Sequence, residues 1–294
     1  MRPVLVAVMG PTASGKTALA ETIADEIGAR LINSDNFQAY RGLDIGTAKP
    51  ERKDEYALVD IKDPSDELGM GEWVRLASEE LHRVYAEARS AVIVGGSGLN
   101  VRALFEGYHD IGVAPTPELR EALNAIGLPD LLEILAAEDP TAFERVDKKN
   151  RVRVQRALEK ARSPRDPVTE LPNFTKVKLA KETDPYRLGT VIDLRTSEMV
   201  QNGWLAEVAT LRDAGWSLSD PGLKAHGYRW LWRHLEGEID LGEAVRLTSA
   251  EVRQYAKRQR TWLRTEPRLD MIGEGDDTLS QAMRRICAAQ IEVN

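Results

Sequence analysis

The segment GPTASGKT at residues 10–17 has the glycine, lysine and threonine spacing of a phosphate-binding loop, or P-loop. In such a loop, backbone N–H groups and the N-terminus of the following helix face phosphate oxygens, and the lysine adds a positive charge. The last hydroxyl is a ligand for Mg²⁺. We therefore predict that a diphosphate or triphosphate binds here, with Thr17 as a Mg²⁺ ligand. Seven residues are expected to contribute: Gly10, Thr12, Ala13, Ser14, Gly15, Lys16 and Thr17.

A P-loop by itself does not define the reaction. ATPases usually have an acidic residue at the end of a buried strand, where it organises Mg²⁺ and water. The best candidate strand here, 91–94, leads instead into the glycine-rich segment 95–98. This absence disfavours ATP hydrolysis as the main activity and leaves Asp35 and Asp60 as the alternative carboxylates for a metal ion.

Two polar residues follow predicted strands, at the edge where open parallel sheets bind ligands. Asp35 ends the second strand, and three roles are open to it: a general base, an indirect Mg²⁺ ligand, or a cap for the following loop. Ser97 lies among glycines, where a hydroxyl either binds phosphate or satisfies a turn. The residue types alone do not choose between these roles.

Two groups of basic residues repeat with spacings of 4, 3 and 4, which places each group along one face of a helix. They lie in two regions of net positive charge, residues 144–187 and 251–268, although the whole chain carries a net charge of -7. One such stripe is commonly a solvated face, but two on an acidic chain favour contact with a phosphate backbone. The groups are Lys149, Arg153, Arg156 and Lys160, and Arg253, Lys257, Arg260 and Arg264.

The predicted helix that contains the second stripe also has an apolar face. We assign that face to the core rather than to base stacking, because it repeats at helical spacing. The tryptophans at 204, 216, 230 and 232 are likewise interpreted as packing residues. The face consists of Val252, Tyr255, Ala256, Gln259 and Trp262.

Short apolar runs alternate with helical periods over the first hundred residues, which is the pattern of a parallel α/β sheet flanked by helices. The predicted strands are 4–9, 30–34, 56–60 and 91–94, and the predicted helices are 17–27 and 72–89. The P-loop follows the first strand and precedes the first helix, as its mechanism requires. We therefore predict a P-loop NTPase-like α/β fold.

From about Tyr108 the sequence pattern changes to helical periods broken by prolines. We predict a smaller, mostly helical inserted domain at 111–187. The P-loop core is then formed by 1–110 and 188–294. Within the core, the apolar run 191–194 is predicted to resume a strand, and the remainder is predicted to be helical.

The composition places the chain among globular proteins. Of its 294 residues, 42% are hydrophobic and 30% are charged, so it has ample material for a core. No stretch approaches the ~18 consecutive apolar residues of a membrane-spanning helix. The single cysteine, Cys287, excludes a disulfide within the chain, and the four histidines are too scattered for zinc-type spacing. We predict a cytoplasmic protein without a membrane partner.

Several segments together resemble the tRNA dimethylallyltransferases, also called tRNA isopentenyltransferases, over nearly the whole chain. A P-loop alone is generic, but the segments that follow are specific in combination. They are GPTASGKT at 10–17, SDNFQAYRGLDIGTAKP at 34–50, DIKDP at 60–64, GGSGL at 95–99, RVQRALE at 153–159, GY at 227–228 and RQYAKRQRTWLR at 253–264.

The resemblance implies transfer of a dimethylallyl group from dimethylallyl diphosphate to N6 of the adenosine just 3′ of the anticodon, position 37 of tRNA. The P-loop then holds the diphosphate as a leaving group, so neither a catalytic water nor an acidic strand end is needed. The implied cofactor is Mg²⁺, and the implied partner is the anticodon stem-loop, clamped by the helical insertion. We expect a monomer.

The resemblance also implies roles for individual residues. Asp35 matches the family's general base, Ser97 falls where the family usually has a threonine hydroxyl, and Arg195 matches an arginine expected near the diphosphate. Contacts with tRNA are expected from both basic stripes and from the segment after the second strand. That segment comprises Asp35, Asn36, Phe37 and Gln38.

Four positions depart from the family's usual pattern. Asn36 stands where serine is common, Asn100 where an aromatic is common, Val152 where glutamine is common, and His226 where isoleucine is common. They bear on base and anticodon-loop contacts and on the choice of tRNA.

The residue types are also compatible with two other functions. One is a small-molecule P-loop kinase in which Asp35 deprotonates a hydroxyl acceptor, and the other is a nucleotide-gated RNA-binding protein. A kinase would consume ATP without RNA, whereas a binding protein would form no new bond.

Overall fold

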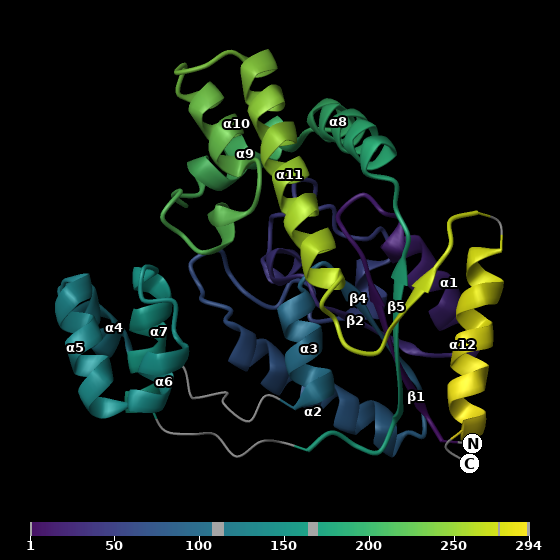
Figure 1. The fold of residues 1–294 in the computed structure, drawn as a ribbon. Coiled ribbons are helices and arrows are strands. Elements are labelled where there is room, and N and C mark those ends of the chain that lie inside the picture. The colour runs from purple at the N-terminus through teal and green to yellow at the C-terminus, as the bar shows by residue number, and fades with distance from the viewer. Residues whose placement is uncertain (1, 108–114, 164–169, 276, 293–294) are drawn as a thin grey trace. The chain divides into compact units, whose positions relative to one another are not determined.

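The computed structural model describes residues 2–107, 115–163, 170–275 and 277–292. Two compact units make up the chain (Figure 1). The larger unit consists of 1–105 and 171–294, and the smaller unit consists of 106–170.

A six-stranded sheet forms the centre of the larger unit, and every neighbouring pair of its strands is parallel. The strand order is β3-β2-β4-β1-β5-β6. This sheet confirms the predicted parallel α/β fold. Its strands are β1 (Val4–Met9), β2 (Arg30–Asn33), β3 (Tyr56–Ala57), β4 (Ala91–Gly95), β5 (Thr175–Lys181) and β6 (Leu269–Ile272).

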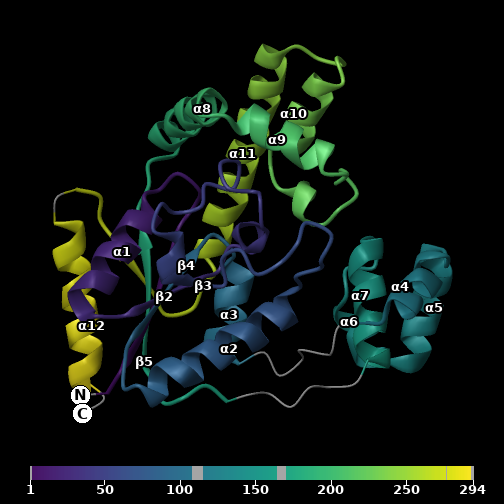
Figure 2. The ribbon, with the colours of Figure 1, turned by 180° about the vertical axis from the view of Figure 1, so that it is seen from behind.

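Eight helices accompany the sheet in the described part of the larger unit. Helices α1 and α12 cover one face, and α2 and α3 cover the other (Figures 1 and 2). The helices are α1 (Lys16–Ile27), α2 (Met70–Ala86), α3 (Gly98–Glu106), α8 (Pro185–Gln201), α9 (Trp204–Asp213), α10 (Tyr228–Leu235), α11 (Leu241–Leu263) and α12 (Thr278–Glu292).

Strand β1 is completely apolar because both of its faces are covered. Val4, Val6 and Val8 pack with α1 and α12. Leu5 and Met9 pack on the opposite side with residues of α2 and α3. This two-sided burial explains why the segment before the P-loop is an uninterrupted apolar run rather than an alternating one.

Helices α8 to α11 lie beyond the carboxyl ends of the strands, where β5 leads directly into α8 (Figure 1). Parallel strands place the loops that follow them at this one edge, which is the usual ligand site of open α/β sheets. The P-loop after β1 and Asp35 after β2 therefore come together here, and α8 and α11 cover them.

Three details of the predicted organisation differ from the structure. The part of the chain after 194 is not wholly helical as predicted, because Leu269–Ile272 forms β6 and pairs with β5. The predicted insertion extends to 187, but 171–187 belongs to the larger unit, where β5 pairs with β1. The predicted strand at 191–194 is wrong, because these residues lie inside α8. Asp184 caps α8 by accepting a hydrogen bond from the Tyr186 N–H, and Pro185 is the first residue of this helix, so α8 begins before the predicted boundary at 187.

The smaller unit is helical and has a core of its own. Leu123, Leu131, Leu135, Val154 and Leu158 are buried together within it. The predicted boundary at 110 and 111 lies outside the described residues. The helices of this unit are α4 (Pro117–Asn124), α5 (Leu128–Glu138), α6 (Pro140–Arg145) and α7 (Arg151–Arg162).

None of the helices in the described part of the chain is both long enough and apolar enough to cross a membrane.

A buried lysine organises the long loop between the short 3-10 helix η1 (Asn36–Ala39) and the 3-10 helix η2 (Lys53–Glu55). The side chain of Lys49 is only 2% exposed, and its ammonium donates to the Tyr40 carbonyl at 2.6 Å and to the Asp44 carboxylate at 2.7 Å. It also donates to the Asp60 carboxylate at 2.5 Å. One buried cation therefore ties two points of the loop to Asp60, which follows β3.

We predict that Lys49→Met destabilises the larger unit by about 2 to 3 kcal/mol, because hydrogen bonds to charged groups are lost and the two carboxylates remain. The matched control is Lys62→Met, which removes a more exposed ion pair with Glu72 and is expected to cost less than about 1 kcal/mol. Urea unfolding followed by tryptophan fluorescence measures both. Equal losses in the two variants would contradict the role of Lys49.

Candidate functional site

The P-loop connects β1 to α1 with two residues in the left-handed region, Ala13 (φ 64°) and Gly15 (φ 77°). The Lys16 ammonium donates to the Pro11 carbonyl at 3.3 Å, within the loop itself. Burial lowers the pKa of Lys16 to about 8, which nearby Arg195 reinforces and the Asp35 carboxylate opposes. A bound anion would therefore stabilise the charged form of Lys16.

The side chain of Gln259 on α11 joins the P-loop to the loop after β4. Its Oε1 accepts from the Thr12 N–H at 2.8 Å, and its Nε2 donates to the Gly96 carbonyl at 3.1 Å. A Cβ atom on Gly96 would overlap the Gln259 amide in this position, so a larger residue would displace the amide from its hydrogen bonds. Trp262, one turn further, approaches Gly98 in the same way. The GGSG segment thus lets α11 approach the sheet.

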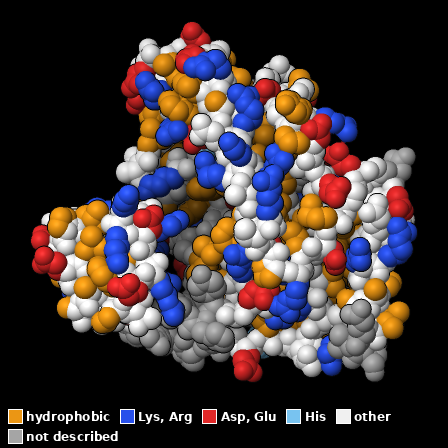
Figure 3. Space-filling view, viewed as in Figure 1, with side chains coloured by type: hydrophobic (Ala, Val, Ile, Leu, Met, Phe, Trp, Pro, Cys, Tyr) orange, Lys and Arg blue, Asp and Glu red, His pale blue; other side chains and the backbone are white. Residues whose placement is uncertain are grey.

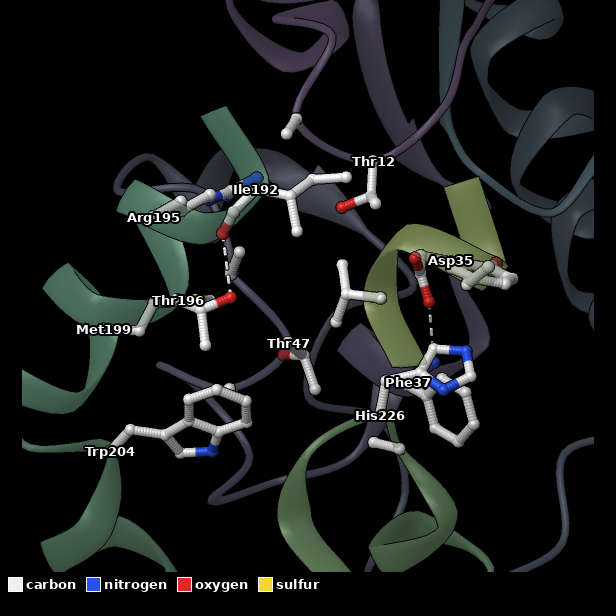
Figure 4. Close-up of a pocket in the computed structure, with 16 residues that line it drawn as sticks. Thr12, Asp35, Phe37, Thr47, Ile192, Arg195, Thr196, Met199, Trp204 and His226 are labelled. Carbon is white, nitrogen blue, oxygen red and sulfur yellow. Dashed lines mark hydrogen bonds between the residues drawn. The ribbon is translucent and has the colours of Figure 1, made fainter. Parts of the chain in front are cut away.

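Asp35 lies two residues after the end of β2 and caps η1. Its Oδ1 accepts from the Phe37 N–H at 3.0 Å (Figure 4), and the Asn33 side chain bonds both the N–H and the carbonyl of Asp35 at 2.8 Å. Burial raises the pKa of the Asp35 carboxyl, while the Phe37 N–H, Lys16 and His226 act in the opposite direction. The carboxylate is thus held rigidly in a site that increases its affinity for a proton.

Two adjoining cavities open beside Asp35, one mainly apolar and one mainly polar. They share Thr12, Asp35, Thr47, Ala48, Arg195 and Tyr255. The apolar cavity is further lined by Phe37, Ile192, Met199, Trp204, Ala225 and Val252, among others (Figure 4). The polar cavity is further lined by Lys16, Thr17, Gln38, Pro50, Tyr56 and Gln259, among others. Such a pair suits a molecule with an anionic end and an apolar end.

Thr47 and Ala48 reach the cavities because a carboxylate on α9 holds the loop before them. Glu207 accepts hydrogen bonds from three consecutive backbone N–H groups, those of Asp44, Ile45 and Gly46, at 2.8, 2.6 and 3.1 Å. The Tyr228 hydroxyl also donates to it, at 2.7 Å. A Cβ atom at position 46 would overlap the Trp204 and Tyr228 rings. The loop can therefore approach α9 this closely only because residue 46 is glycine.

Arg195 lines both cavities from the inner face of α8. Ile192 and Thr196 are buried on that face, whereas Val191 and Leu194 are exposed on the outer one. Burial lowers the pKa of the Arg195 guanidinium from its usual value. The α8 helix thus points a second cation toward the phosphate-binding loop.

Ser97 and Asn36 are not among the described residues that line either cavity. Ser97 immediately precedes α3, and its carbonyl accepts from the Asn100 N–H at 3.1 Å. The Asn36 carbonyl oxygen Oδ1 accepts from Asn100 Nδ2 at 2.7 Å, and its Nδ2 donates to the Leu68 carbonyl. Two of the unusual residues noted above therefore contact each other, and together they support η1.

The first basic stripe belongs to the smaller unit and is less regular than its spacing suggests. Lys149 lies before α7, which begins at Arg151 after the Asn150 cap. Arg153 lies 3.7 Å from Asp147, and Arg156 donates to Glu159 at 2.6 Å. Lys160 lies on α7 as predicted. Acidic neighbours thus partly neutralise this stripe.

The second basic stripe lies along the exposed side of α11, where Lys and Arg side chains gather in Figure 3. Arg253 forms an ion pair with Asp193 of α8. Lys257 and Arg260 lie on the helix, and Arg264 is its C-terminal cap. Arg260 and Arg264 also line a groove together with Lys181.

Several cavity residues were missed in the sequence because their types suit packing equally well. Tyr255 and Gln259 were assigned to the core and Trp204 to packing, but all three line the cavities. Their helical spacing indicated one buried face of α11 and could not show that this face covers the P-loop. His226 was noted only as a departure from the family pattern, and Thr47 only as part of the motif at 34–50, so neither was predicted to line a cavity.

The chain combines a P-loop α/β fold with a polar cavity lined by the P-loop that adjoins an apolar one, an arrangement that suits a transferase whose substrate has an anionic end and an apolar end. It belongs to the IPP transferase family, whose model matches residues 38–266. A second model, described as isopentenyl transferase, matches residues 3–58. The matched families transfer isopentenyl groups, so the kinase and binding-protein alternatives receive no support.

Curated relatives and solved structures agree with this assignment. The chain is 36% identical to tRNA dimethylallyltransferase 1 of Citrifermentans bemidjiense, over 89% of each chain. It is 35% identical to the tRNA dimethylallyltransferase of Gloeobacter violaceus, over 94% of this chain and 95% of that one. The crystal structure of a tRNA isopentenylpyrophosphate transferase from Bacillus halodurans matches with a TM-score of 0.73 and 31% identity, over 99% of this chain and 98% of that one.

We predict that Gln259→Leu loosens the P-loop. The substitution preserves volume but removes the two hydrogen bonds to Thr12 and Gly96, at about 1 kcal/mol each, and leaves these backbone groups unpaired. Hydrogen exchange of the P-loop amides should accelerate, while amides of β5 should exchange as in the unchanged protein. Unaltered exchange at Thr12 would contradict this role.

Proposed function

We propose that this chain transfers a dimethylallyl group from dimethylallyl diphosphate to N6 of the adenosine 3′ of the anticodon in tRNA, position 37, and releases diphosphate. The observation that carries this proposal is that a polar cavity with the P-loop lysine and an apolar cavity meet at a half-buried carboxylate, Asp35. Membership of the IPP transferase family and the names of the relatives support it.

The diphosphate end of the donor is assigned to the P-loop, residues 10–17. Backbone N–H groups and the start of α1 provide donors, while Lys16 and Arg195 provide charge. An anion beside Lys16 favours its ammonium form, which burial otherwise weakens. The same groups stabilise the negative charge that grows on the diphosphate as the bond to the allylic carbon breaks.

The residues of the polar cavity fit a Mg²⁺ ion that binds mainly through oxygen atoms of the ligand. Thr17 presents a hydroxyl there, and no group of three or more His, Cys, Asp or Glu side chains in the described part of the chain could hold a metal ion. Mg²⁺ is commonly bound by one or two protein oxygens and phosphate groups. We assign Thr17 as the protein ligand, and the bound ion would neutralise charge on the diphosphate.

Asp35 is assigned as the general base. An exocyclic adenine amine is a poor nucleophile because its lone pair is delocalised into the ring, so removal of its proton during attack lowers the barrier. Burial gives the Asp35 carboxyl the raised pKa that suits a base, and the Phe37 N–H fixes its orientation. Ser97 keeps its predicted role as a hydroxyl near the diphosphate or Asp35.

The acceptor tRNA is assigned to two surfaces, the stripe on α11 and the stripe of the smaller unit. Basic side chains contact phosphates and position the strand, and the target base must leave its stack to reach Asp35. Asn36, Phe37 and Gln38 follow Asp35 on η1 and are assigned to the neighbourhood of that base. We also propose a cytoplasmic monomer, in which Cys287 is an exposed free thiol.

The central test mixes the protein with Mg²⁺, unmodified tRNA and either dimethylallyl diphosphate or ATP, and analyses the nucleosides by mass. We expect a five-carbon adduct on adenosine from the isoprenoid donor and none from ATP. Asp35→Asn should slow single-turnover transfer by ~10²–10⁴ and leave tRNA affinity nearly intact, because shape is kept and the proton acceptor is lost.

Asp63→Asn is the matched control, because Asp63 forms an exposed ion pair with Arg41 away from the cavities. It should transfer at the rate of the unchanged protein. Transfer by Asp35→Asn within a few-fold of that rate would refute the assignment of the base. Phosphate transfer from ATP to a small molecule, with tRNA unchanged, would refute the proposed function itself.

We predict that Arg260→Glu and Arg156→Glu weaken binding of every tRNA alike. Each lost phosphate contact should lower the slope of log affinity against log salt by about 1 or less. Arg75→Glu, which changes an exposed arginine paired with Glu79 on α2, is the control and should bind normally. Loss of binding for one tRNA alone, with an unchanged slope, would show that these arginines read bases.

A further inference from the structure

The apolar cavity has two sides, which the mechanism above does not distinguish. Asp35, Phe37 and His226 lie on one side of it (Figure 4). The opposite side consists of α8 and the first residue of α9, and it contains neither the assigned base nor the segment assigned to the acceptor base. It is therefore the side available to the organic end of the donor. Its labelled residues are Ile192, Thr196, Met199 and Trp204.

The register of α8 gives the depth of this side. Arg195 lines both cavities and so marks their junction. Met199 lines the apolar cavity but not the polar one, and it lies one turn, or ~6 Å, further along α8 than Arg195. The helix ends at Gln201, and Gly203 (φ 103°) leads the chain into α9, which begins with Trp204. The apolar cavity therefore extends about one helical turn past Arg195 before it meets Met199 and Trp204.

The indole of Trp204 is held firmly in place. It is only 2% exposed, and its ring centroid lies 5.6 Å from that of Tyr228 in an edge-to-face arrangement. Cβ atoms on Gly46 and Gly227 would overlap opposite ends of the indole, the first at its nitrogen and the second at its six-membered ring. The ring is therefore wedged between two backbone segments, and it cannot turn aside to admit a longer molecule unless the backbone moves.

The α8 side of the cavity suits a hydrocarbon. Ile192 and Met199 contribute aliphatic side chains. The Thr196 hydroxyl donates to the Ile192 carbonyl at 2.8 Å (Figure 4), and the Thr47 hydroxyl donates to the Leu43 carbonyl. Both hydroxyls are thus bonded within their own segments and do not donate to a bound molecule. An aliphatic tail would leave water here without breaking any of these hydrogen bonds.

We propose that Met199 and Trp204 determine the length of the donor's tail and limit it to five carbons. This inference rests on the proposed function and deepens it by naming the residues that select the donor. With the diphosphate at the P-loop, one helical turn past Arg195 accommodates the four-carbon main chain of a dimethylallyl group. The eight-carbon main chain of a geranyl group would collide with the Trp204 ring, or would pull the diphosphate away from the P-loop.

The test compares dimethylallyl diphosphate with geranyl diphosphate as donors to unmodified tRNA, with kcat/KM measured for each donor and the nucleosides analysed by mass. The unchanged protein should prefer the shorter donor by ~100-fold or more, since a closed apolar pocket discriminates ~10–200-fold against a single extra methylene. Met199→Ala should lower this preference at least tenfold, mainly through a gain with the longer donor. Trp204→Phe, which keeps an aromatic ring in the wall, should lower it in the same direction.

Met283→Ala is the matched control. Met283, like Met199, is a partly buried methionine, but it packs on α12 and lines neither cavity. This variant loses the same side-chain volume and should keep the donor preference of the unchanged protein. Inhibition by inorganic diphosphate should be the same in all the variants, because the P-loop is not altered, and this readout separates a change in the tail side from a general distortion of the site.

An unaltered donor preference in Met199→Ala and Trp204→Phe would overturn the proposal, and so would equal use of both donors by the unchanged protein. If Trp204→Phe does not fold, Met199→Ala decides alone, because its side chain is only partly buried. These results differ from failure of the proposed function, in which the unchanged protein would form no prenylated adenosine from either donor.

Discussion

The side-chain amide of Gln259 is the interaction on which the rest of the site depends. It forms hydrogen bonds with the P-loop at Thr12 and with the loop after β4 at Gly96. A single side chain on α11 therefore links the loops that follow two strands. The helix also contributes Tyr255 to both cavities and its basic stripe to the surface, so one helix both lines the cavities and carries the exposed positive charge.

Burial and charge are balanced against each other in the site. Burial disfavours the charged form of both Lys16 and Asp35, and each partly restores the other by its opposite charge. A donor diphosphate entering the polar cavity would favour the lysine cation, while proton transfer to Asp35 would relieve its buried charge. Burial disfavours the charges of Lys16 and Asp35 when no substrate is bound. The same burial therefore favours a reaction that brings an anion to Lys16 and a proton to Asp35.

The loops at this edge of the sheet are held by buried polar groups rather than by regular structure. Lys49 joins Tyr40, Asp44 and Asp60, and Glu207 accepts from three successive backbone N–H groups. Satisfied buried networks of this kind specify one loop conformation, because any other would leave charges unpaired. This accounts for the polar residues of the segment DIGTAKP, which contribute little side-chain chemistry of their own.

The sequence by itself determined the first four strands of the sheet, the P-loop and the place of Asp35, but not strands β5 and β6. These follow from local patterns: an apolar run before a glycine-rich loop, a helical period after it, and a carboxylate at a strand end. The motifs also identified the family, as the comparisons confirm. The helical character of the segment 117–162 was equally local, apart from Lys149, which precedes the α7 helix.

Only the tertiary structure decided which buried face is a core and which is a site. The faces of α11 and α9 carry Tyr255, Gln259 and Trp204 at helical spacing, and that spacing is the same whether the helix packs on a sheet or covers a cavity. The strand predicted at 191–194 was wrong for a related reason, since its apolar residues are divided between the two sides of α8. The contact of His226 with Glu251 joins residues 25 positions apart in the chain, so no local pattern could show it.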